Sequence, residues 1–397
     1  MRRGVRAIAS AGATGFSLLV VVAAPRVASA DSMDPALARL TLDDNCRTGS
    51  SADGTGQFYN PASGFNRCRL NHAAFAKLVA QLGTAIAPLP TYSARTTGFG
   101  GYRFGVLGQY TTIDSGAHYW REGTQGPRDE STGQDSVRND DPDSILQNYQ
   151  VFLAKGFPFG LELGAGFGYL VNTQIVSAGG DVRLSLFEGF RSSIPGYFPD
   201  VGVGGSVRTI TGSSELKLTV ASFDAQLSKP IPIAGTVVLQ PRVGYQFLFM
   251  FGDSGLVDLT PNTDPNALCG YQGDNTPATP DPDKGGVFDG QPVCSGSSAD
   301  FNNNVVFDRV RLARHRINFG STLRYQMLQF GFHVATDVVR PGAVNDGDTV
   351  VEDALDPDDP SGNTTFRLNK LEDDPRTEGD DAVKNQWTFG FEVGAAF

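Results

Sequence analysis

Basic residues, histidine, cysteine and methionine are all scarce in this chain of 397 residues. Its 32 Lys and Arg face 43 Asp and Glu, a formal net charge of −11, which argues against nucleic-acid binding through phosphate neutralisation. With 4 Met against 48 Gly, and no long tract of Ala, Glu, Lys and Leu, the composition argues against a helical bundle or a coiled coil. A sheet-built domain of the barrel type accommodates this length better than one ordinary domain does.

The first thirty residues have the three parts of a cleaved secretory signal. These parts are a basic start, a short apolar run and a small-residue ending: Arg2, Arg3, Arg6, residues 16–24, Ala28 and Ala30. The pattern predicts cleavage before Asp31, and the apolar run is about half the length that a membrane-spanning helix needs. We therefore expect residues 1–30 to direct export by general secretion, with the twin-arginine route as the alternative.

Acidic residues are concentrated in three stretches of the mature chain, whose net charge after cleavage is −15. Residues 114–146 carry −5, residues 252–304 carry −7 and residues 341–385 carry −9. The same stretches are rich in turn-forming residues and cannot bury enough apolar surface to form a core. They are predicted to be long loops, which requires an architecture that tolerates such loops.

Between the loops, apolar residues alternate with polar or small ones, which is the pattern of a strand with one apolar face. Ten segments show it: 102–110, 149–155, 161–169, 181–186, 201–210, 215–227, 237–249, 313–325, 328–338 and 386–397. In the sixth segment the apolar positions change phase near Ser222, which predicts a bulge. The three long loops all fall at one end of an up-and-down meander, so the sequence predicts an all-β, antiparallel transmembrane β-barrel over 97–397 with about ten strands, roughly eight to twelve.

The polar side of these strands carries charged side chains that a narrow lumen would pair. They are Arg103, Glu162, Arg183, Lys217, Arg242, Arg324, His333, Asp337 and Glu392. We expect His333 to pair with Asp337 on the same face of one strand. A soluble β-sandwich would also alternate but would expose its charged side, and it is the alternative.

The last strand alternates apolar residues up to a terminal aromatic one: Trp387, Phe389, Phe391, Val393 and Phe397. This ending resembles the C-terminal signal by which bacterial outer-membrane β-barrels are recognised by the barrel assembly machinery. The resemblance implies location in the outer membrane, with its lipid and lipopolysaccharide as surroundings. Independently, only a closed sheet lets strands pair every backbone polar group in hydrocarbon.

Residues 31–96 precede the sheet and contain one predicted helix, over 71–87, with Asn71 as its N-cap. Because the first strand should rise from the periplasm, we expect this helix on the periplasmic side, packed on the rim or inserted as a plug. Residues 58–62 (Phe-Tyr-Asn-Pro-Ala) resemble the N-terminal hatch of the long-chain fatty-acid transporter family, which implies hydrophobic cargo. A helix ahead of a small barrel is also similar to uncharacterised Gram-negative outer-membrane barrels.

Four cysteines in an exported chain are expected to be oxidised. The predicted topology puts two on each side of the membrane, which leaves the pairs Cys46–Cys68 and Cys269–Cys294. No metal-ligand spacing and no phosphate-binding glycine loop occurs, so we predict no cofactor and no metal centre. The acidic loops are expected to be solvated, or bridged to lipopolysaccharide by divalent cations.

The sequence therefore predicts an integral outer-membrane barrel that passes a small or hydrophobic solute. Side chains nearly fill a ten-strand lumen, so a non-conducting structural or surface-adhesive barrel is the first alternative. The second is a barrel hydrolase of the protease or lipase type, because ten-stranded outer-membrane proteases use acidic and histidine residues at their outer rim. We expect no enzyme, because the four histidines are far apart in the sequence: His72, His118, His315 and His333.

Overall fold

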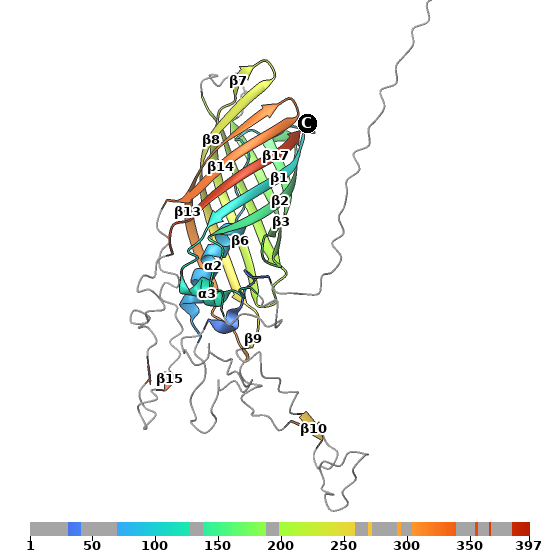
Figure 1. Cartoon of the computed structure of the whole chain (residues 1–397). Helices are drawn as coiled ribbons and strands as arrows, with labels where there is room; N and C mark the ends of the chain where they lie inside the picture. Colours follow the sequence, from blue (N-terminus) through green and yellow to red (C-terminus); the bar gives the residue numbers. More distant parts are fainter. Residues whose placement is uncertain are drawn as a thin grey trace, which may run out of the picture.

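A computed structural model describes the sheet and most of the segment before it (Figure 1). The described residues are 31–40, 70–127, 138–187, 198–258, 269–271, 292–294, 304–338, 354–355, 365–366 and 383–397. The predicted signal, including Ala28 and Ala30, lies outside them, as do Cys46, Cys68 and residues 58–62. The predictions made for those residues therefore stay predictions.

Ten strands form a closed antiparallel barrel, which confirms the predicted fold class. They are β1 (Tyr102–Thr112), β2 (Ile145–Gly156), β3 (Leu161–Leu170), β4 (Val176–Phe187), β5 (Asp200–Thr211), β6 (Leu216–Ser228), β8 (Val237–Ser254), β13 (Val310–Tyr325), β14 (Leu328–Asp337) and β17 (Trp387–Ala396). Each pairs with the next one along the chain, and β17 pairs with β1 to close the sheet. All ten predicted strands are present.

Shorter strands and helices lie at the two ends of the barrel. The strand β7 (Ile231–Ala234) pairs with β8 alone, and three small pairs lie in the long connections: β9 (Val257–Asp258) with β12 (Asn304–Val305), β10 (Cys269–Tyr271) with β11 (Pro292–Cys294), and β15 (Ala354–Leu355) with β16 (Thr365–Phe366). The helices are η1 (Leu37–Arg39), α2 (His72–Ile86), α3 (His118–Gly123) and η2 (Pro158–Gly160). None of these helices is long and apolar enough to cross a membrane.

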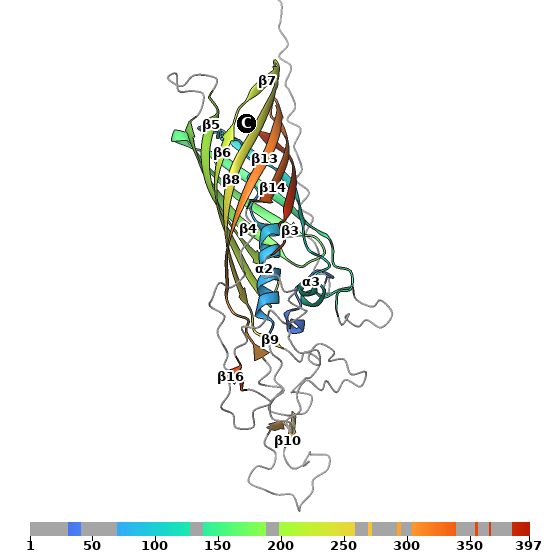
Figure 2. The same cartoon turned by 90° about the vertical axis from the view of Figure 1, so that its left-hand side faces the viewer.

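The two ends of the barrel differ in their connections. The links β1–β2, β8–β13 and β14–β17 are the long ones, and all three leave the same end of the sheet (Figures 1 and 2). We call this the loop end. The opposite end carries the C-terminus, the β2–β3 link and the two-residue β13–β14 turn, and we call it the turn end.

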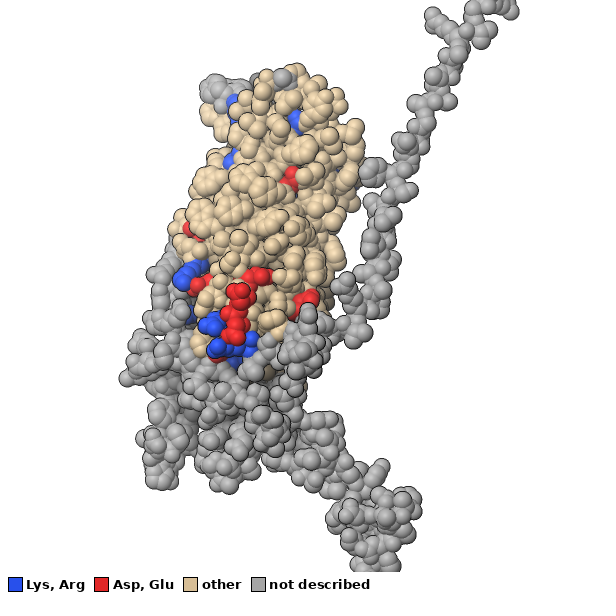
Figure 3. All heavy atoms as spheres, in the orientation of Figure 1, with Lys and Arg blue, Asp and Glu red and all other residues tan. Residues whose placement is uncertain are grey.

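The outward face of the barrel is an apolar band. Val106, Val151, Phe167, Phe223 and Phe391 lie on it and are all exposed. Their neighbours along each strand point into the lumen, as the alternating burial of β1 and β6 shows, and apart from Leu107 and Phe152 they are polar or glycine. In Figure 3 the largest group of described charged side chains on the visible face lies toward the loop end, and only scattered charges lie on the barrel above it. Such a band is suited to hydrocarbon, and it is the reverse of what a soluble sandwich presents.

The predicted bulge near Ser222 is wrong. Strand β6 pairs with β5 and with β8 in an unbroken register through this position, and every even-numbered residue from Leu216 to Ser228 is buried on the inward side. The apolar pattern of the sequence changes phase because the lumen changes from apolar to polar along its length, and not because the strand is bulged. Its loop-end half is apolar and its turn-end half is polar, so inward residues change from Leu218 and Val220 to Asp224 and Gln226.

The N-terminal segment runs through the barrel rather than under it (Figure 2). Residues 31–40 lie at the loop end, where the Met33 amide donates to the Asn172 carbonyl at 3.0 Å. Helix α2 follows, capped by the Asn71 side chain on the Ala74 amide at 2.9 Å. The chain then crosses to the turn end, where the Gly100 amide donates to the Gly156 carbonyl just before β1 begins.

The position of the helix corrects one expectation. We placed it beside the short turns because β1 starts there, but α2 lies at the loop end of the lumen. The reason is that residues 87–101 form neither helix nor strand and cross the turn-end half of the lumen between the helix and β1.

Candidate functional site: a lumen filled by the N-terminal segment

Helix α2 occupies the loop-end half of the lumen as an ordinary hydrophobic core. Phe75, Leu78, Val79, Leu82 and Ile86 are at most 3% exposed, and they pack in one cluster with inward residues of the barrel wall. The wall residues of this cluster include Leu146, Leu170, Ile210, Leu218, Val220, Leu248 and Met250. The sequence predicts polar inward residues along the whole of each strand. In this half the inward residues are apolar because they pack against α2.

Two glycines show how closely the helix approaches the wall. A Cβ atom built on Gly83 of α2 would lie 2.7 Å from the Met250 Sδ atom, and one built on Gly252 of β8 would lie 2.5 Å from a Val79 methyl group. A side chain at Gly83 would displace the end of the Met250 side chain, and one at Gly252 would force Val79 and the helix to shift. The helix and the wall therefore leave no passage between them along this contact.

The loop-end mouth is covered by η1 and α3. Leu37, Leu40 and Trp120 are nearly fully buried and belong to the same cluster as α2. The Trp120 indole donates to the Gln81 side-chain oxygen at 2.6 Å, and the Gln81 amide donates to the Tyr119 hydroxyl at 2.8 Å. The buried side chain of Gln81 therefore has hydrogen-bond partners in α3, and these bonds connect α2 to the helix that covers the mouth.

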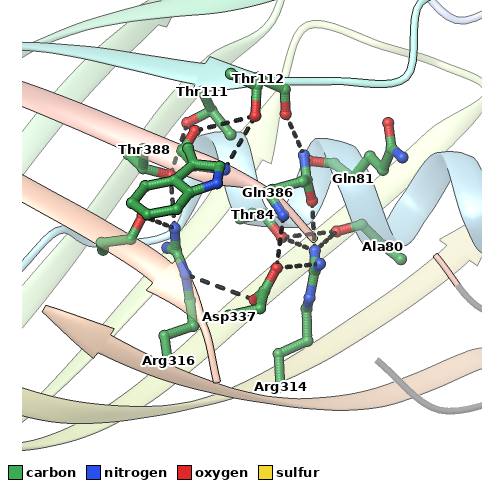
Figure 4. Close-up of polar contacts among 12 residues, drawn as sticks. Ala80, Gln81, Thr84, Thr111, Thr112, Arg314, Arg316, Asp337, Gln386 and Thr388 are labelled. Atoms are coloured by element: carbon green, nitrogen blue, oxygen red, sulfur yellow. Dashed lines mark hydrogen bonds and ion pairs between the residues drawn. The ribbon is translucent and has the colours of Figure 1, made fainter. Parts of the chain in front are cut away.

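An ion-pair cluster ties the helix to three neighbouring strands (Figure 4). Arg314 lies 2.7 Å from Asp337 and also donates to the Ala80 carbonyl, Thr84 and Gln386. Arg316 lies 3.8 Å from Asp337 and donates to Thr388 at 2.6 Å. We call Arg314, Arg316 and Asp337 the loop-end cluster.

The two arginines of this cluster were missed in the sequence. The signal was available, because Arg314 and Arg316 alternate with His315 and Ile317 and so share the inward side of β13 with Asn318. Both are fully buried, so the charges are compensated by Asp337 and by carbonyl and hydroxyl oxygens rather than by water.

In the turn-end half, side chains of the wall bind the extended segment after α2. The Tyr92 hydroxyl donates to Asp224 at 2.5 Å, and its carbonyl accepts from Arg242 at 2.8 Å. The Arg183 guanidinium lies 3.5 Å from the centroid of the Tyr92 ring and donates to the Ser93 carbonyl. The wall therefore contacts this segment through both its backbone and its side chains.

The end of the segment is fixed by two carboxylates. Arg95 pairs with Asp200 at 2.6 Å, and the Thr97 amide donates to Glu162 at 2.9 Å. Asp200 lies at the start of β5 and Glu162 near the start of β3, both at the turn end. These contacts hold the segment across the barrel mouth.

Most of the predicted lumen charges meet in one place, which we call the turn-end cluster. Arg183 lies 2.7 Å from Glu162, and Arg103 lies 3.5 Å from Glu392 and 3.9 Å from Glu162. The cluster consists of Arg103, Glu162, Arg183, Arg242, His333 and Glu392, all less than 9% exposed. A cavity of about 30 Å³ beside it has room for one or two water molecules.

Three of the predicted lumen residues do not join this cluster. Lys217 points outward from β6. It was expected in the lumen because the supposed bulge put Leu216, Leu218 and Val220 on the outward face. Arg324 has inward parity but lies exposed at the turn end, where it donates to the Gln326 carbonyl at 3.0 Å. Asp337 belongs to the loop-end cluster.

The predicted pairing of His333 with Asp337 is wrong. The His333 Nε2 atom lies 3.4 Å from the Glu392 carboxylate, and its Nδ1 atom lies 2.5 Å from Arg242. Residues four apart on one strand are about 13 Å apart along it, whereas Glu392 comes from the neighbouring strand β17. His333 therefore finds its partners across the sheet.

The other histidines lie apart from this cluster and from one another. His72 lies 3.5 Å from Asp308, His118 lies 2.9 Å from Glu122, and His315 contacts Tyr245 on the outward face. Across the described part of the chain, no three His, Cys, Asp or Glu side chains come together in a way that could hold a metal ion. The described acidic residues thus do not define a divalent-cation site.

The remaining predicted sites are only partly visible. Trp387, Phe391, Val393 and Phe397 lie exposed on the outward face, and Phe389 is half-buried on the same side. Cys269 and Cys294 are direct partners across β10 and β11. The described residues establish neither disulfide, so both disulfides, like the assembly role of the last strand, stay predictions.

Two carboxyl groups at the loop end are buried by the N-terminal residues. Glu215, just before β6, accepts a hydrogen bond from the Leu37 amide at 2.7 Å, and burial raises its pKa. Asp34 accepts from the Gln174 amide at 2.7 Å, and burial raises its pKa as well. Both groups therefore hold the segment 31–40 to the barrel at some cost in desolvation.

Comparison with known proteins gives structural matches only. No family model and no curated protein matches the chain. Among solved structures, Ail, the attachment invasion locus protein of Yersinia pestis in complex with the heparin analogue sucrose octasulfate, is similar at 8% identity over 75% of this chain and 99% of that one, with a TM-score of 0.19. The outer membrane protein Omp33 of Acinetobacter baumannii is similar at 7% identity over 75% and 99%, with a TM-score of 0.21. CdiB from Acinetobacter baumannii is similar at 9% identity over 75% and 60%, with a TM-score of 0.17. At such scores the assignment of the barrel rests on the strand pairing itself.

Proposed function

We propose that the protein is an integral outer-membrane barrel whose lumen is closed by its own N-terminal segment. It acts as a non-conducting anchor that holds its long acidic connections at the cell surface. The outward apolar band and the closed sheet support the membrane location. By the usual arrangement of such barrels, short turns face the periplasm and long loops face outward, which orients the loop end toward the outside.

The observation that carries this proposal is the way the lumen is filled. In the loop-end half, α2 is buried in one hydrophobic cluster with the wall, and the wall comes close to it at Gly83 and Gly252. In the turn-end half, Arg183, Arg242, Asp224 and Glu162 bind the extended segment directly. Removing either part would expose apolar surface or leave buried charges unpaired, so the segment is built as part of the fold.

The sequence predicted passage of a solute, and a conductance measurement tests that hypothesis against a closed lumen. The mature chain reconstituted in planar bilayers should show no single-channel steps. A cross-link between α2 and the wall decides whether any steps come from movement of the helix. Gly83→Cys with Met250→Cys suits this purpose, because a Cβ on Gly83 would lie 3.3 Å from the Met250 Cγ atom, near the position of a disulfide sulfur.

The cross-linked variant is made with the four native cysteines changed to serine. Channel steps that vanish on oxidation and return on reduction would overturn the proposal and make α2 a gate. The single variants Gly83→Cys and Met250→Cys, treated with the same oxidant, are the controls. Heat-modifiable migration on a gel checks in each case that the barrel is folded.

A further inference from the structure

Three cations surround one carboxylate on the outward face at the loop end. Asp253 of β8 lies 3.3 Å from Arg311 and 3.6 Å from Arg309, and its partner across the strand pair is Lys217 of β6. Their side chains are accessible, with Arg309 81% and Arg311 46% exposed. We call Lys217, Asp253, Arg309 and Arg311 the basic patch, and it has a formal charge of +2.

The arginine nearest the strand is held in place from three sides. Arg311 donates to the Val310 carbonyl at 2.9 Å and to Asp253, and its guanidinium lies 5.4 Å from the centroid of the Phe251 ring. Arg311 also donates to the Gly252 carbonyl at 3.4 Å, so three of the five N–H donors of its guanidinium have protein partners and two are left for a ligand. Asp253 therefore orders the arginines but leaves the patch positive.

The charge of the patch contrasts with its surroundings. The connection that precedes Arg309 along the chain carries −6 over residues 254–304, without Asp253, and the other two long connections are acidic as well. General repulsion of anions is thus expected at this end of the barrel, except at the basic patch. Exposed cations grouped at this one place are suited to bind an anion that lies close to the barrel wall.

Below the patch, toward the turn end, the outward face is hollowed. A groove of about 580 Å³ lies over β4, β5, β6 and β8, and its walls include Leu184, Val203, Phe223, Tyr245 and Phe247. Its floor is formed at Gly205, where a Cβ would have ordinary contacts of 3.7 Å and more. The groove is lined mainly by apolar side chains.

The patch and the groove are joined along one strand. From Lys217 the outward residues of β6 are Thr219, Ala221 and Phe223, the last of which lines the groove. The six residue-to-residue steps from Lys217 to Phe223 span about 20 Å along the strand. Small side chains line this path, while the neighbouring outward residues of β8 are phenylalanines. A ligand with an anionic head and an apolar tail fits this order of features.

We propose that this face binds a phosphate-bearing lipid of the outer leaflet. The phosphate lies among Lys217, Arg309 and Arg311, and one acyl chain follows β6 into the groove beside Gly205. Arginine binds phosphate through paired donors, and cations at the membrane surface attract anionic headgroups. The inference rests on the proposed function only for the level of the patch in the membrane.

The test uses the mature full-length chain in a neutral detergent that contains no phosphate. Dioleoyl phosphatidic acid is titrated and bound lipid is counted by native mass spectrometry, with dioleoyl glycerol and inorganic phosphate as separate probes. Phosphatidic acid should bind, dioleoyl glycerol should not, and inorganic phosphate should bind far more weakly. Arg309→Gln with Arg311→Gln should weaken phosphatidic acid binding about tenfold or more.

Two further variants separate the parts of the site. Arg324→Gln removes an exposed cation at the turn end and should leave binding unchanged. Gly205→Leu fills the groove and should weaken phosphatidic acid several-fold without changing the binding of inorganic phosphate. Heat-modifiable migration shows that each variant is folded.

Three results would overturn the site. They are equal binding by the wild type and the double arginine variant, equal binding of dioleoyl glycerol and phosphatidic acid, or inorganic phosphate binding as tightly as the lipid. None of these depends on conductance. A failure here leaves the closed lumen standing, and channel activity in bilayers would leave the lipid site standing.

Discussion

The two halves of the lumen hold the same N-terminal segment by different means. In the loop-end half, α2 is buried among aliphatic and aromatic side chains, with ion pairs only at its edge. In the turn-end half, the non-helical stretch after α2 is bound by arginines and carboxylates of β3, β4, β5 and β8. A helix satisfies its own backbone and can be surrounded by apolar groups, whereas an extended segment needs partners for its carbonyls and amides.

The difference predicts that the loop-end half is the more sensitive to loss of volume. Phe75 is fully buried, and its ring centroid lies 4.8 Å from that of Phe307. Phe75→Ala should lower the free energy of unfolding by about 3–5 kcal/mol. Urea unfolding in detergent, followed by tryptophan fluorescence, measures this loss, since Trp120 reports on the same cluster. An equally large loss from Phe391→Ala, on the outward face, would contradict the comparison.

The turn-end half should be more sensitive to loss of charge. Arg183→Met removes the closest partner of Glu162 and leaves Arg103 at 3.9 Å as its remaining cation. Breaking one side of a buried pair should cost about 3 kcal/mol. Adding Glu162→Gln should restore part of that loss, as a double-mutant cycle in urea can show. A double variant less stable than the sum of the single ones would show that the pair is not the cause.

A single hydroxyl group tests the contact between the segment and the wall. Tyr92→Phe removes the hydrogen bond to Asp224 and leaves that buried carboxylate with one fewer donor. We expect a loss of about 2 kcal/mol in the free energy of unfolding, and increased hydrogen exchange over residues 88–97. Tyr245→Phe, whose hydroxyl lies on the outward face, is the matched control and should leave exchange in that segment unchanged.

Acidity should affect the attachment of residues 31–40 rather than either half of the lumen. Burial raises the pKa of Glu215, so the folded protein binds its proton more tightly than the unfolded one does. Its contribution to stability is fully present below the ordinary glutamate pKa of about 4.5 and is lost as pH rises through the raised value. Hydrogen exchange over 31–40 should therefore be slower at about pH 5 than at about pH 8.

Glu215→Gln should reduce this pH dependence. Asp34 has a raised pKa from the same cause, so the dependence should vanish only when Asp34→Asn is added. Slower exchange at the higher pH, after correction for the intrinsic rate, would have the wrong sign for two buried carboxyl groups.

The smallest effect is expected where the supposed bulge misplaced a residue. Lys217→Leu changes an outward side chain at the rim and should alter the free energy of unfolding by no more than about 0.5 kcal/mol. Gln226→Leu, on the inward side of the same strand, removes the side chain that donates to Asp224 and should cost more. Equal losses from both would mean that the face assignment of β6 is incorrect.

The strands and their order could be predicted because alternation is a local property. Each strand of the barrel carries its own pattern, and even Arg103, Glu162 and Glu392 were placed inward from parity alone. What failed depends on neighbours that are distant in sequence. Leu218 and Val220 look misplaced on β6 until α2 is known to lie against them, and His333 cannot be assigned to Glu392 without the register of β14 on β17.

The helix itself could also be predicted from local sequence, since its N-cap and its apolar spacing lie within residues 71–87. Its position was not, because it depends on whether the chain from Ala87 to β1 doubles back or continues across the barrel. Arg242 and Asp224 decide this by binding Tyr92. No feature of the sequence near Tyr92 indicates those partners.

The path of the N-terminal segment has a consequence for biogenesis. The sheet closes where β1 meets β17, yet α2 and residues 87–101 already pass through the ring that this seam completes. The segment must be in place before the seam closes, or be threaded afterwards through a finished ring. With the loop end outward, a peptide fused ahead of Asp31 would be delivered through the ring and presented to the medium.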